Sequence, residues 1–181
     1  MIDCYRRFLE GDDKSLEEII HTYKDGLILY LNGYVHNLVL AEELTEETFV
    51  KLVLKRPVFF KRSAFKTWLY AIARNIALDH LRKRKHITAL LTDCENLADE
   101  DEDLEKKYLY QEQKYQLHET IKKLKPEYRQ VLWLVYFEGF SLKETARILG
   151  KTVHNAETLA YRARQALKTK LLEEGFEYEN L

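Results

Sequence analysis

The sequence predicts an all-α protein of two small helical domains joined by an acidic flexible linker. The 181 residues include only 2 Pro and 6 Gly, fewer turn residues than an all-β fold needs. Apolar residues recur at spacings of three and four along most of the chain, which is typical of amphipathic helices. The pattern stops at residues 89–106, where five acids follow one another from Asp99 to Asp103. We therefore expect domains at residues 1–88 and 107–181.

Composition excludes several classes of protein. With 46% hydrophobic and 33% charged residues, the chain is expected to be globular. The longest apolar run, Val131–Phe137, is too short to cross a membrane, and the first four residues lack the features of a signal peptide, so we expect a cytoplasmic protein without membrane insertion. Cys4 and Cys94 are isolated, and no cysteine lies near a histidine at ligand spacing. No disulfide, metal site or cofactor is therefore expected.

The first helix of the N-terminal domain is predicted over residues 15–39, where apolar side chains keep helical spacing. Asp12 or Asp13 can cap it. Gly26 and Gly33 lower helix propensity, so the length of this helix is left open.

Two further helices are expected to flank a loop. The pattern predicts a helix over residues 41–55, with acids in its first turns that suit the helix dipole. Pro57 breaks this helix, so residues 56–63 form a connecting loop. Ser63 opens the next helix, which ends in the basic run 82–85. Its expected buried stripe consists of Phe65, Trp68, Leu69, Ile72, Ile76 and Leu81.

The C-terminal domain is expected to begin within residues 104–124. Pro126 suits the first turn of a helix that stops at Gly139. Ser141 and Glu144 form a capping box, because a hydroxyl and a carboxylate three residues apart satisfy each other's free amide donors. A second, short helix is expected to follow.

Small residues then indicate a helix-turn-helix. The short helix is expected to end at Leu149, and Gly150 supplies a left-handed turn. Ala146 allows two helices to cross closely, and Ala156 and Leu159 anchor the second helix. An ordinary helical hairpin is the alternative interpretation.

The second helix of this motif would present a polar outer face. Asn, Glu and Arg side chains read base edges in a major groove, whereas Thr, Tyr and Lys commonly hold phosphates. Thr152 can cap the helix, and Lys168 and Lys170 follow where backbone contacts would be useful. The outer face is expected to consist of Val153, His154, Asn155, Glu157, Thr158, Tyr161, Arg162 and Arg164.

Charge is segregated along the chain, although the formal net charge is −1. Residues 1–60 sum to −4, residues 61–86 to +7, residues 87–120 to −7 and residues 121–181 to +3. Two basic blocks separated by an acidic one indicate two polyanion-binding surfaces, with ordinary solvated helix faces as the alternative. A nearly neutral chain is not expected to bind DNA tightly by itself. A partner is therefore implied.

The first basic block mixes cations with aromatic rings, which suits opened or single-stranded nucleic acid. Phe65 and Trp68 fall on the buried stripe, so we interpret them as core residues. Phe59 and Phe60 lie in the loop and are better candidates for touching a base. The block comprises Lys61, Arg62, Phe65, Lys66, Trp68, Tyr70, Arg74, Arg82, Lys83, Arg84 and Lys85.

Two stretches resemble bacterial sigma factors of the sigma-70 family, of the extracytoplasmic-function (group 4) type. Residues 41–49 (AEELTEETF) and 65–75 (FKTWLYAIARN), with Asp79 and the basic run, resemble region 2. Residues 124–129 (LKPEYR) through 161–164 (YRAR) resemble region 4. The resemblance covers most of the chain outside the linker.

The resemblance implies a subunit that binds core RNA polymerase and directs promoter recognition, strand opening and transcription initiation. It implies that the helix over residues 38–55 docks on a coiled coil of the largest polymerase subunit, and that the helix over residues 126–137 helps grip the polymerase flap. An anti-sigma factor is a further expected partner. The residues expected to contact core polymerase are Glu42, Glu43, Leu44, Glu46, Glu47 and Phe49.

The resemblance also implies two DNA contacts. The loop over residues 56–63 would capture an unstacked base of the minus-ten element, while the helix-turn-helix would read the minus-thirty-five element. The expected minus-ten residues are Phe59, Phe60, Lys61, Arg62, Arg74, Asn75, Arg82, Lys83 and Arg84. The expected minus-thirty-five residues are Thr152, His154, Asn155, Glu157, Thr158, Tyr161, Arg162 and Arg164.

The sequence departs from the family pattern at three places. Leu40 and Glu46 replace a usual acid and a usual glutamine, so polymerase docking is expected to differ in detail. Residues 154–157 replace a commoner Gly-Thr-Val-Lys, so the DNA sequence read is expected to differ too. We also hypothesise that the acids Asp99–Asp103 occupy a basic channel of the polymerase in place of nucleic acid.

Three other functions are alternatives. One is a free-standing helix-turn-helix regulator, which would need a self-complementary surface and palindromic half-sites. Another is an enzyme, but the chain lacks HExxH, a Gly-rich phosphate loop and a nucleophile elbow, and His118 has no histidine four residues later. The last is a helical adaptor that binds only proteins. No catalytic residue is expected.

Overall fold

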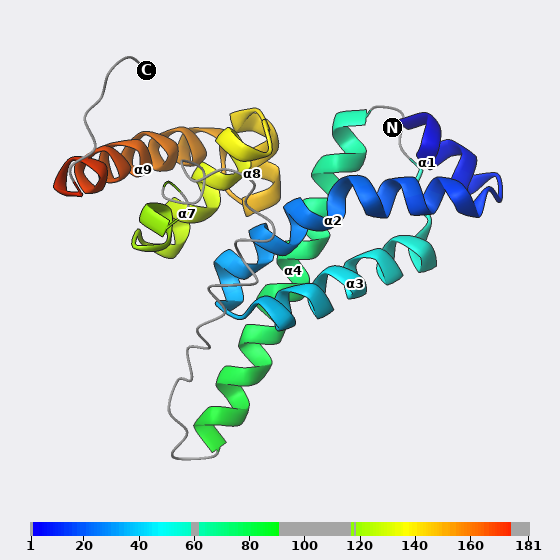
Figure 1. Ribbon diagram of the computed structural model, residues 1–181, viewed down its shortest axis with the longest axis horizontal. Helices are drawn as coiled ribbons and strands as arrows, with labels where there is room; N and C mark the ends of the chain where they lie inside the picture. Colours follow the sequence, from blue (N-terminus) through cyan, green and yellow to red (C-terminus); the bar gives the residue numbers. More distant parts are fainter. Residues whose placement is uncertain (1, 59–61, 91–116, 118, 175–181) are drawn as a thin grey trace. The chain divides into compact units, whose positions relative to one another are not determined.

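The computed structural model describes residues 2–58, 62–90, 117 and 119–174. The chain divides into two compact units, Met1–Glu102 and Asp103–Leu181. All regular secondary structure within the described residues is helical, as Figure 1 shows, which confirms the all-α prediction. Most of the predicted linker at residues 89–106 lies outside the described residues, so its boundaries remain a prediction.

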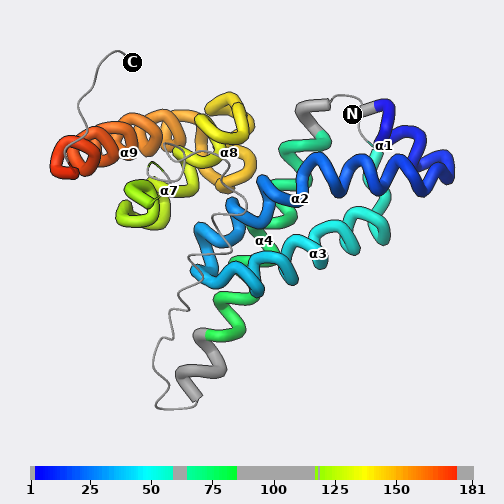
Figure 2. Tube along the Cα trace, in the orientation of Figure 1, coloured from blue at the N-terminus to red at the C-terminus, as the bar shows by residue number. Residues whose placement is uncertain are grey.

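Four helices make up the described part of the first unit. They are α1 (Ile2–Leu9), α2 (Asp13–Val35), α3 (Leu38–Lys55) and α4 (Arg62–Leu90). Helix α2 packs against the other three, and α3 also packs against α4. Figure 2 shows α2 and α3 running in opposite directions along each other. The sequence interpretation missed α1, whose eight residues are too few for a clear periodic signal and depend on tertiary packing.

Helix α2 is continuous through both glycines. The Asp12 carboxylate caps it by accepting a hydrogen bond from the Lys14 amide at 3.1 Å. Each glycine costs a helix about 1 kcal/mol relative to alanine. The buried face of α2 outweighs this cost, because its large apolar side chains contribute about 1.5–3 kcal/mol each when removed from water.

A two-residue turn separates α2 from α3. His36 adopts a left-handed conformation with φ of 51°, which ends α2 at Val35, four residues before the predicted end. The side chain of Asn37 then accepts a hydrogen bond from the Leu40 amide at 2.7 Å and starts α3 at Leu38. The predicted start at residue 41 was therefore late, because the Asn37 cap was not recognised.

Helix α4 starts one residue before the predicted Ser63 and continues five residues past the basic run, to Leu90. Phe65 and Leu69 of the predicted stripe are buried, which confirms Phe65 as a core residue. Trp68 is only partly buried, so the core interpretation holds for it in part.

The described part of the second unit includes a short helical stretch at residues 119–122, before α7. It continues with α7 (Pro126–Leu132), the π-helical segment η1 (Trp133–Phe137), α8 (Leu142–Leu149) and α9 (Val153–Glu173). The predicted helix from Pro126 is confirmed, with its last part widened into η1. There the rings of Trp133 and Phe137 stack with centroids 4.5 Å apart.

The helix-turn-helix forms as predicted. Ser141 and Glu144 make both hydrogen bonds of the capping box, at 3.3 Å from the Glu144 amide to the Ser141 hydroxyl and at 3.0 Å from the Ser141 amide to the carboxylate. Gly150 ends α8 with φ of 63°, and the Thr152 hydroxyl caps α9 by accepting from the Asn155 amide at 3.2 Å. Ala156 is fully buried where α8 and α9 pack together.

Candidate nucleic-acid and polymerase interfaces

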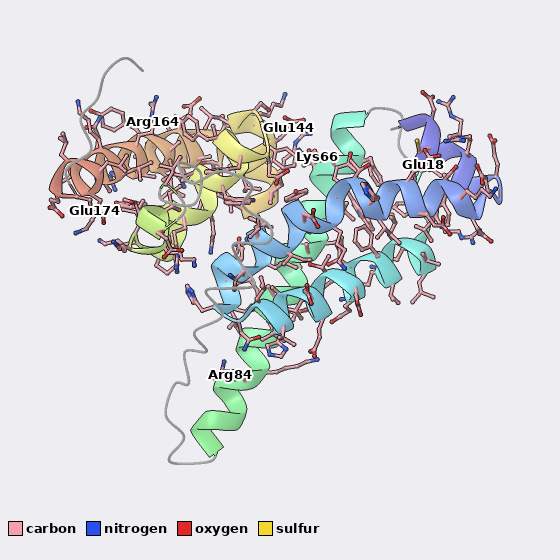
Figure 3. The ribbon with its side chains drawn as sticks, in the orientation of Figure 1. Glu18, Lys66, Arg84, Glu144, Arg164 and Glu174 are labelled. Carbon is pink, nitrogen blue, oxygen red and sulfur yellow. The ribbon has the colours of Figure 1, made fainter. Side chains whose placement is uncertain are left out.

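The outer face of α9 is polar, and the buried residues of its first three turns are alanines. Ala156, Ala160 and Ala163 are buried against the rest of the unit. Small side chains let α9 lie close to α8 and α7, so residues on the opposite side project fully into solvent. Figure 3 shows Arg164 projecting from α9 in this way. The exposed residues of this face are Val153, His154, Asn155, Glu157, Tyr161, Arg162 and Arg164, with Thr158 partly exposed.

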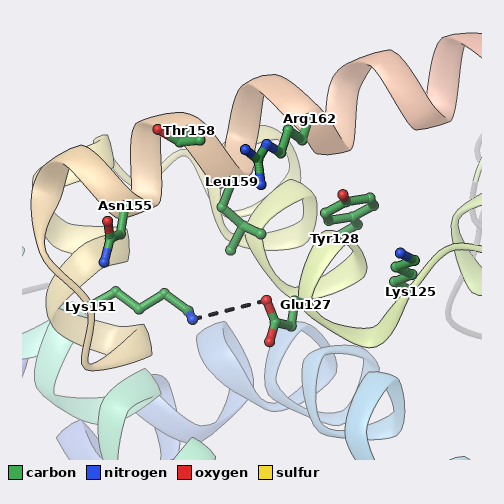
Figure 4. A pocket seen from close by; sticks show the side chains of 8 residues that line it. All are labelled: Lys125, Glu127, Tyr128, Lys151, Asn155, Thr158, Leu159 and Arg162. Atoms are coloured by element: carbon green, nitrogen blue, oxygen red, sulfur yellow. Dashed lines mark ion pairs between the residues drawn. The ribbon is translucent and has the colours of Figure 1, made fainter.

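An open groove of about 460 Å³ adjoins this face, between α9 and the start of α7 (Figure 4). Lys125, Lys151 and Arg162 bring positive charge to its wall. The ammonium of Lys151 lies 4.0 Å from the carboxylate of Glu127, a contact too long and too exposed to hold it firmly. The groove is lined by Lys125, Glu127, Tyr128, Lys151, Asn155, Thr158, Leu159 and Arg162.

Sequence reasoning missed Lys125 and Lys151 as members of this surface. Lys125 directly precedes α7, and Lys151 lies two residues before α9, so both are near a helix N-terminus, where the helix dipole already favours anions. A lysine at a helix N-terminus, close to the predicted DNA-reading face, was the sequence signal that could have identified both residues.

Part of the predicted minus-ten surface lies along the outer side of α4. Asn75, Arg82, Lys83 and Arg84 are exposed, and Arg84 projects from the helix in Figure 3. The guanidinium of Arg82 lies 3.0 Å from the Asp79 carboxylate, but both groups are well exposed, so this pair does not prevent contact with phosphate.

Arg74 is placed differently from the other predicted minus-ten residues. It is half-buried, and its guanidinium interacts with the hydroxyl of Tyr34. Burial raises the pKa of Tyr34 to about 12, an effect that the nearby Arg74 opposes. This side chain therefore joins α4 to α2, and the predicted contact of Arg74 with minus-ten DNA stays a prediction.

The loop residues Phe59, Phe60 and Lys61 lie outside the described residues, and of Arg62 only its position at the start of α4 is described. The structure describes the residues that precede this loop. Arg56 ends α3 in a left-handed conformation with φ of 41°, and its guanidinium lies 5.1 Å from the centre of the Phe8 ring.

The acids of α3 face solvent to different degrees. Glu43, Glu46 and Glu47 are exposed and Glu42 is partly exposed. Leu44 is 4% exposed and Phe49 6%. The expectation of direct contact through Leu44 is therefore corrected, since its side chain packs in the core and supports the helix from beneath.

An apolar groove of about 430 Å³, which we call the α2–α3 groove, runs beside these acids. Phe49 forms part of its floor, so this residue reaches the surface at one edge. Val50 is 54% exposed and Leu54 77%, which sequence reasoning missed. Their spacing of four residues, off the core stripe, was the available signal. The groove is lined by Ile20, Lys24, Thr45, Glu46, Phe49, Val50, Val53 and Leu54.

Two features are absent from the part of the chain that the structure describes. In it, no three His, Cys, Asp or Glu side chains gather in a way that could hold a metal ion. No helix within the same residues is long and apolar enough to span a membrane.

Comparison with known proteins now identifies the family. Residues 19–87 match Sigma-70 region 2, and residues 114–167 match Sigma-70, region 4. The chain is 32% identical over 159 residues to RNA polymerase sigma factor YlaC of Bacillus subtilis (strain 168), with 87% of this chain and 92% of that protein covered. It is 29% identical over 171 residues to ECF RNA polymerase sigma factor SigW of the same strain, with 90% and 91% covered.

Two solved structures share the fold. CnrH in complex with the cytosolic domain of CnrY superposes with a TM-score of 0.66 at 19% identity, covering 97% of this chain and 98% of that chain. The sigma factor RpoE in complex with the anti-sigma factor NepR from Bartonella quintana has a TM-score of 0.66 at 20% identity, covering 88% and 98%.

The helical units and the sequence matches together define a bacterial transcription initiation factor. The chain belongs to the sigma-70 family of RNA polymerase sigma factors, of the extracytoplasmic-function type. It is an RNA polymerase sigma factor that acts in promoter recognition.

Proposed function

We propose that the two units divide promoter recognition between them, with the second unit reading the duplex minus-thirty-five element. The observation that supports this proposal is the arrangement of side chains on α9. Alanines are buried on one side of its first three turns, and exposed polar side chains line the other side. Asn155 and Arg162 can each make paired hydrogen bonds to a base edge in the major groove. Lys125 and Lys151 extend the surface towards the phosphates beside that groove.

The first unit is proposed to bind the minus-ten element during strand opening. The segment joining α3 and α4 would take an unstacked base through Phe59 or Phe60, and the exposed cations of α4 would follow the phosphates of the opened strand. Arg82, Lys83 and Arg84 support this role because all three are exposed along α4.

Core RNA polymerase is proposed to dock on the outer face of α3. Glu43, Glu46 and Glu47 supply charge, and the adjoining α2–α3 groove supplies the apolar area that a stable interface needs. Since Leu44 is buried, its contribution is to hold α3 in place. In this proposal the chain acts in the cytoplasm, where polymerase and promoter DNA are found.

The chain is proposed to act by binding alone, without transforming a substrate. Base capture and groove reading need stacking surfaces, cations and amide groups, and these are the groups that the two surfaces present.

An anti-sigma factor is proposed as a second protein partner. A partner that covered Val50 and Leu54 would bury exposed apolar side chains and block the docking of polymerase in one step. Such a partner must compete with core polymerase for the chain, which a competition binding measurement tests directly. Simultaneous binding of both proteins would reject this mode of inhibition.

Transcription by core polymerase on a promoter library, with and without the purified chain, tests the proposed division. Arg162→Ala should weaken binding to the upstream duplex, whereas Phe60→Ala should impair strand opening and leave that binding intact. Equal effects of both substitutions on both steps would contradict the division.

Neutralising Asp99–Asp103 tests the linker hypothesis in the same assay, and unchanged initiation would remove it.

A free-standing DNA-binding regulator is the remaining alternative. A gel shift on duplex promoter DNA without polymerase separates the two functions. Because the net charge of the chain is only −1, we expect weak binding in that experiment.

A further inference from the structure

Helix α1 contacts the connection between α3 and α4. Tyr5 of α1 is 2% exposed, and its hydroxyl donates a hydrogen bond to the Pro57 carbonyl oxygen at 2.6 Å. Pro57 is the second residue after α3 ends and lies 52 positions from Tyr5 in the sequence. The contact therefore joins the N-terminal helix to the start of a distant connecting segment.

The same tyrosine contacts the other end of this connection. Its ring packs against Phe65, in the first turn of α4, with centroids 4.6 Å apart and planes inclined by 32°. Tyr23 of α2 adds an edge contact to Phe65 at 5.8 Å. One side chain thus touches residues on both sides of the segment that joins the two helices.

A second residue of α1 supports the same region. Phe8, 1% exposed, lies under the guanidinium of Arg56, the residue that ends α3 with φ of 41°. Arginine adopts positive φ with a steric penalty, so a contact that holds it there helps to set the direction in which the chain leaves α3.

We propose that Tyr5 is a positioning residue for strand opening, because it fixes both ends of the α3–α4 connection before DNA arrives. The inference rests on the proposed function of that connection in base capture. A segment whose ends are already ordered loses less conformational freedom on binding an unpaired base, so the base is held more tightly.

The chemistry of Tyr5 suits this role. Burial raises the pKa of its hydroxyl to about 12, with Arg56 opposing the change, so the group stays protonated and remains a donor at neutral pH. Pro57 has no amide hydrogen, but its carbonyl oxygen accepts the bond from the tyrosine.

The test replaces Tyr5 by phenylalanine, which removes the hydroxyl and keeps the ring against Phe65. Holoenzyme is assembled from core polymerase and the full chain, on a promoter selected from a library with the unaltered chain. Opening is followed with 2-aminopurine in the non-template strand. We expect Tyr5→Phe to lower the equilibrium constant for opening by roughly two- to tenfold, the effect of one hydrogen bond, with unchanged binding to a minus-thirty-five duplex.

Tyr30→Phe is the matched control. Tyr30 is also 2% exposed, and its hydroxyl pairs at 3.0 Å with that of Tyr34, within α2. This variant removes a buried hydroxyl from the same unit and leaves the contact between Tyr34 and Arg74 in place. If it impairs opening as much as Tyr5→Phe does, the role of Tyr5 is general stability and the inference is wrong.

A double-mutant cycle provides the decisive measurement, with Phe59→Ala or Phe60→Ala as partner, whichever impairs opening more. If Tyr5 acts through the connection, Tyr5→Phe should have little further effect once that phenylalanine is truncated, whereas independent effects would add and overturn the inference. Impaired opening in Phe60→Ala with none in Tyr5→Phe would also overturn it and leave the proposed function standing. Normal opening in both Phe59→Ala and Phe60→Ala would reject the proposed function itself, and the inference with it.

Discussion

Lys123 and Glu174, 51 residues apart in the sequence, are joined by an ion pair of 2.7 Å between ammonium and carboxylate. The same carboxylate accepts a hydrogen bond from the Thr120 hydroxyl at 2.6 Å. Glu174 therefore ties the C-terminal end of α9 to the helical stretch at the start of the described second unit. This tie holds the far end of the helix whose first turns are proposed to read DNA.

The first prediction concerns acid pH. Hydrogen bonds from Lys123 and Thr120 hold the pKa of Glu174 below its usual value. A carboxyl with a lowered pKa in the folded state stabilises the fold above its unfolded pKa, and this stabilisation is lost as pH falls through the folded pKa. Glu174→Gln should therefore lower the melting temperature of the second unit at neutral pH, and the two melting temperatures should converge in acid.

Tryptophan fluorescence can follow this unit by itself. The chain has two tryptophans, so a Trp68→Phe background leaves Trp133 of the second unit as the only tryptophan. Glu173→Gln is the control, since Glu173 is exposed and forms an ion pair of 2.7 Å with Lys170, three residues earlier in the same helix. Equal losses of melting temperature from both substitutions would show that the hydrogen bonds of Glu174 to Lys123 and Thr120 do not stabilise this unit specifically.

Substitution of two glycines by alanine should change the free energy of unfolding in opposite directions. Gly150 has φ of 63° and Gly33 lies inside α2, and an added Cβ would meet nothing within 4 Å at either site. Gly150→Ala should cost about 1–2 kcal/mol through left-handed strain. Gly33→Ala should stabilise the first unit by about 0.5–1 kcal/mol through helix propensity. Urea unfolding, followed by Trp133 and Trp68 respectively, measures both, and effects of the same sign would contradict the assignment.

Arg162 should contribute to DNA affinity through a specific base contact. Its substitution by alanine is expected to weaken holoenzyme binding to the minus-thirty-five duplex by about 1–3 kcal/mol if it reads a guanine. Arg162→Lys keeps the charge but loses the paired hydrogen-bonding geometry. We expect lysine to restore little of the affinity, whereas full restoration would identify a phosphate contact instead. Binding at several salt concentrations provides the measurement.

A charge placed in the α2–α3 groove should lower the affinity of the chain for core polymerase. Val50→Asp is expected to weaken core polymerase binding by about tenfold or more, because it places a carboxylate where an apolar contact is proposed. Val39→Asp is the matched control, since Val39 lies at the other end of α3, is 52% exposed and does not line the groove. Fluorescence anisotropy of the labelled chain measures both affinities, and an equal loss from Val39→Asp would place the interface elsewhere on α3.

Local sequence signals predicted the second unit closely. The Ser141–Glu144 box, Gly150 and Thr152 act on backbone groups within a few residues of themselves, so their effect can be identified without tertiary structure. The outward face of α9 followed from these signals, because a known helix start and a helical period determine which side chains share a face.

The positions of α1 and of the Arg74 side chain depend on tertiary contacts, which local sequence signals do not show. Helix α1 is short, and its contacts with Pro57 and Phe65 join residues more than fifty positions apart, so no periodic pattern could show them. The half-buried place of Arg74, against Tyr34, likewise depends on how α2 packs on α4. The sequence by itself determined the longer helices, the caps of α8 and α9 and the segregation of charge along the chain, because these depend on neighbouring residues. Only the folded structure decided the place of α1 and which polar side chains, such as those of Tyr5 and Arg74, hold the helices together, because burial is set by packing between distant segments.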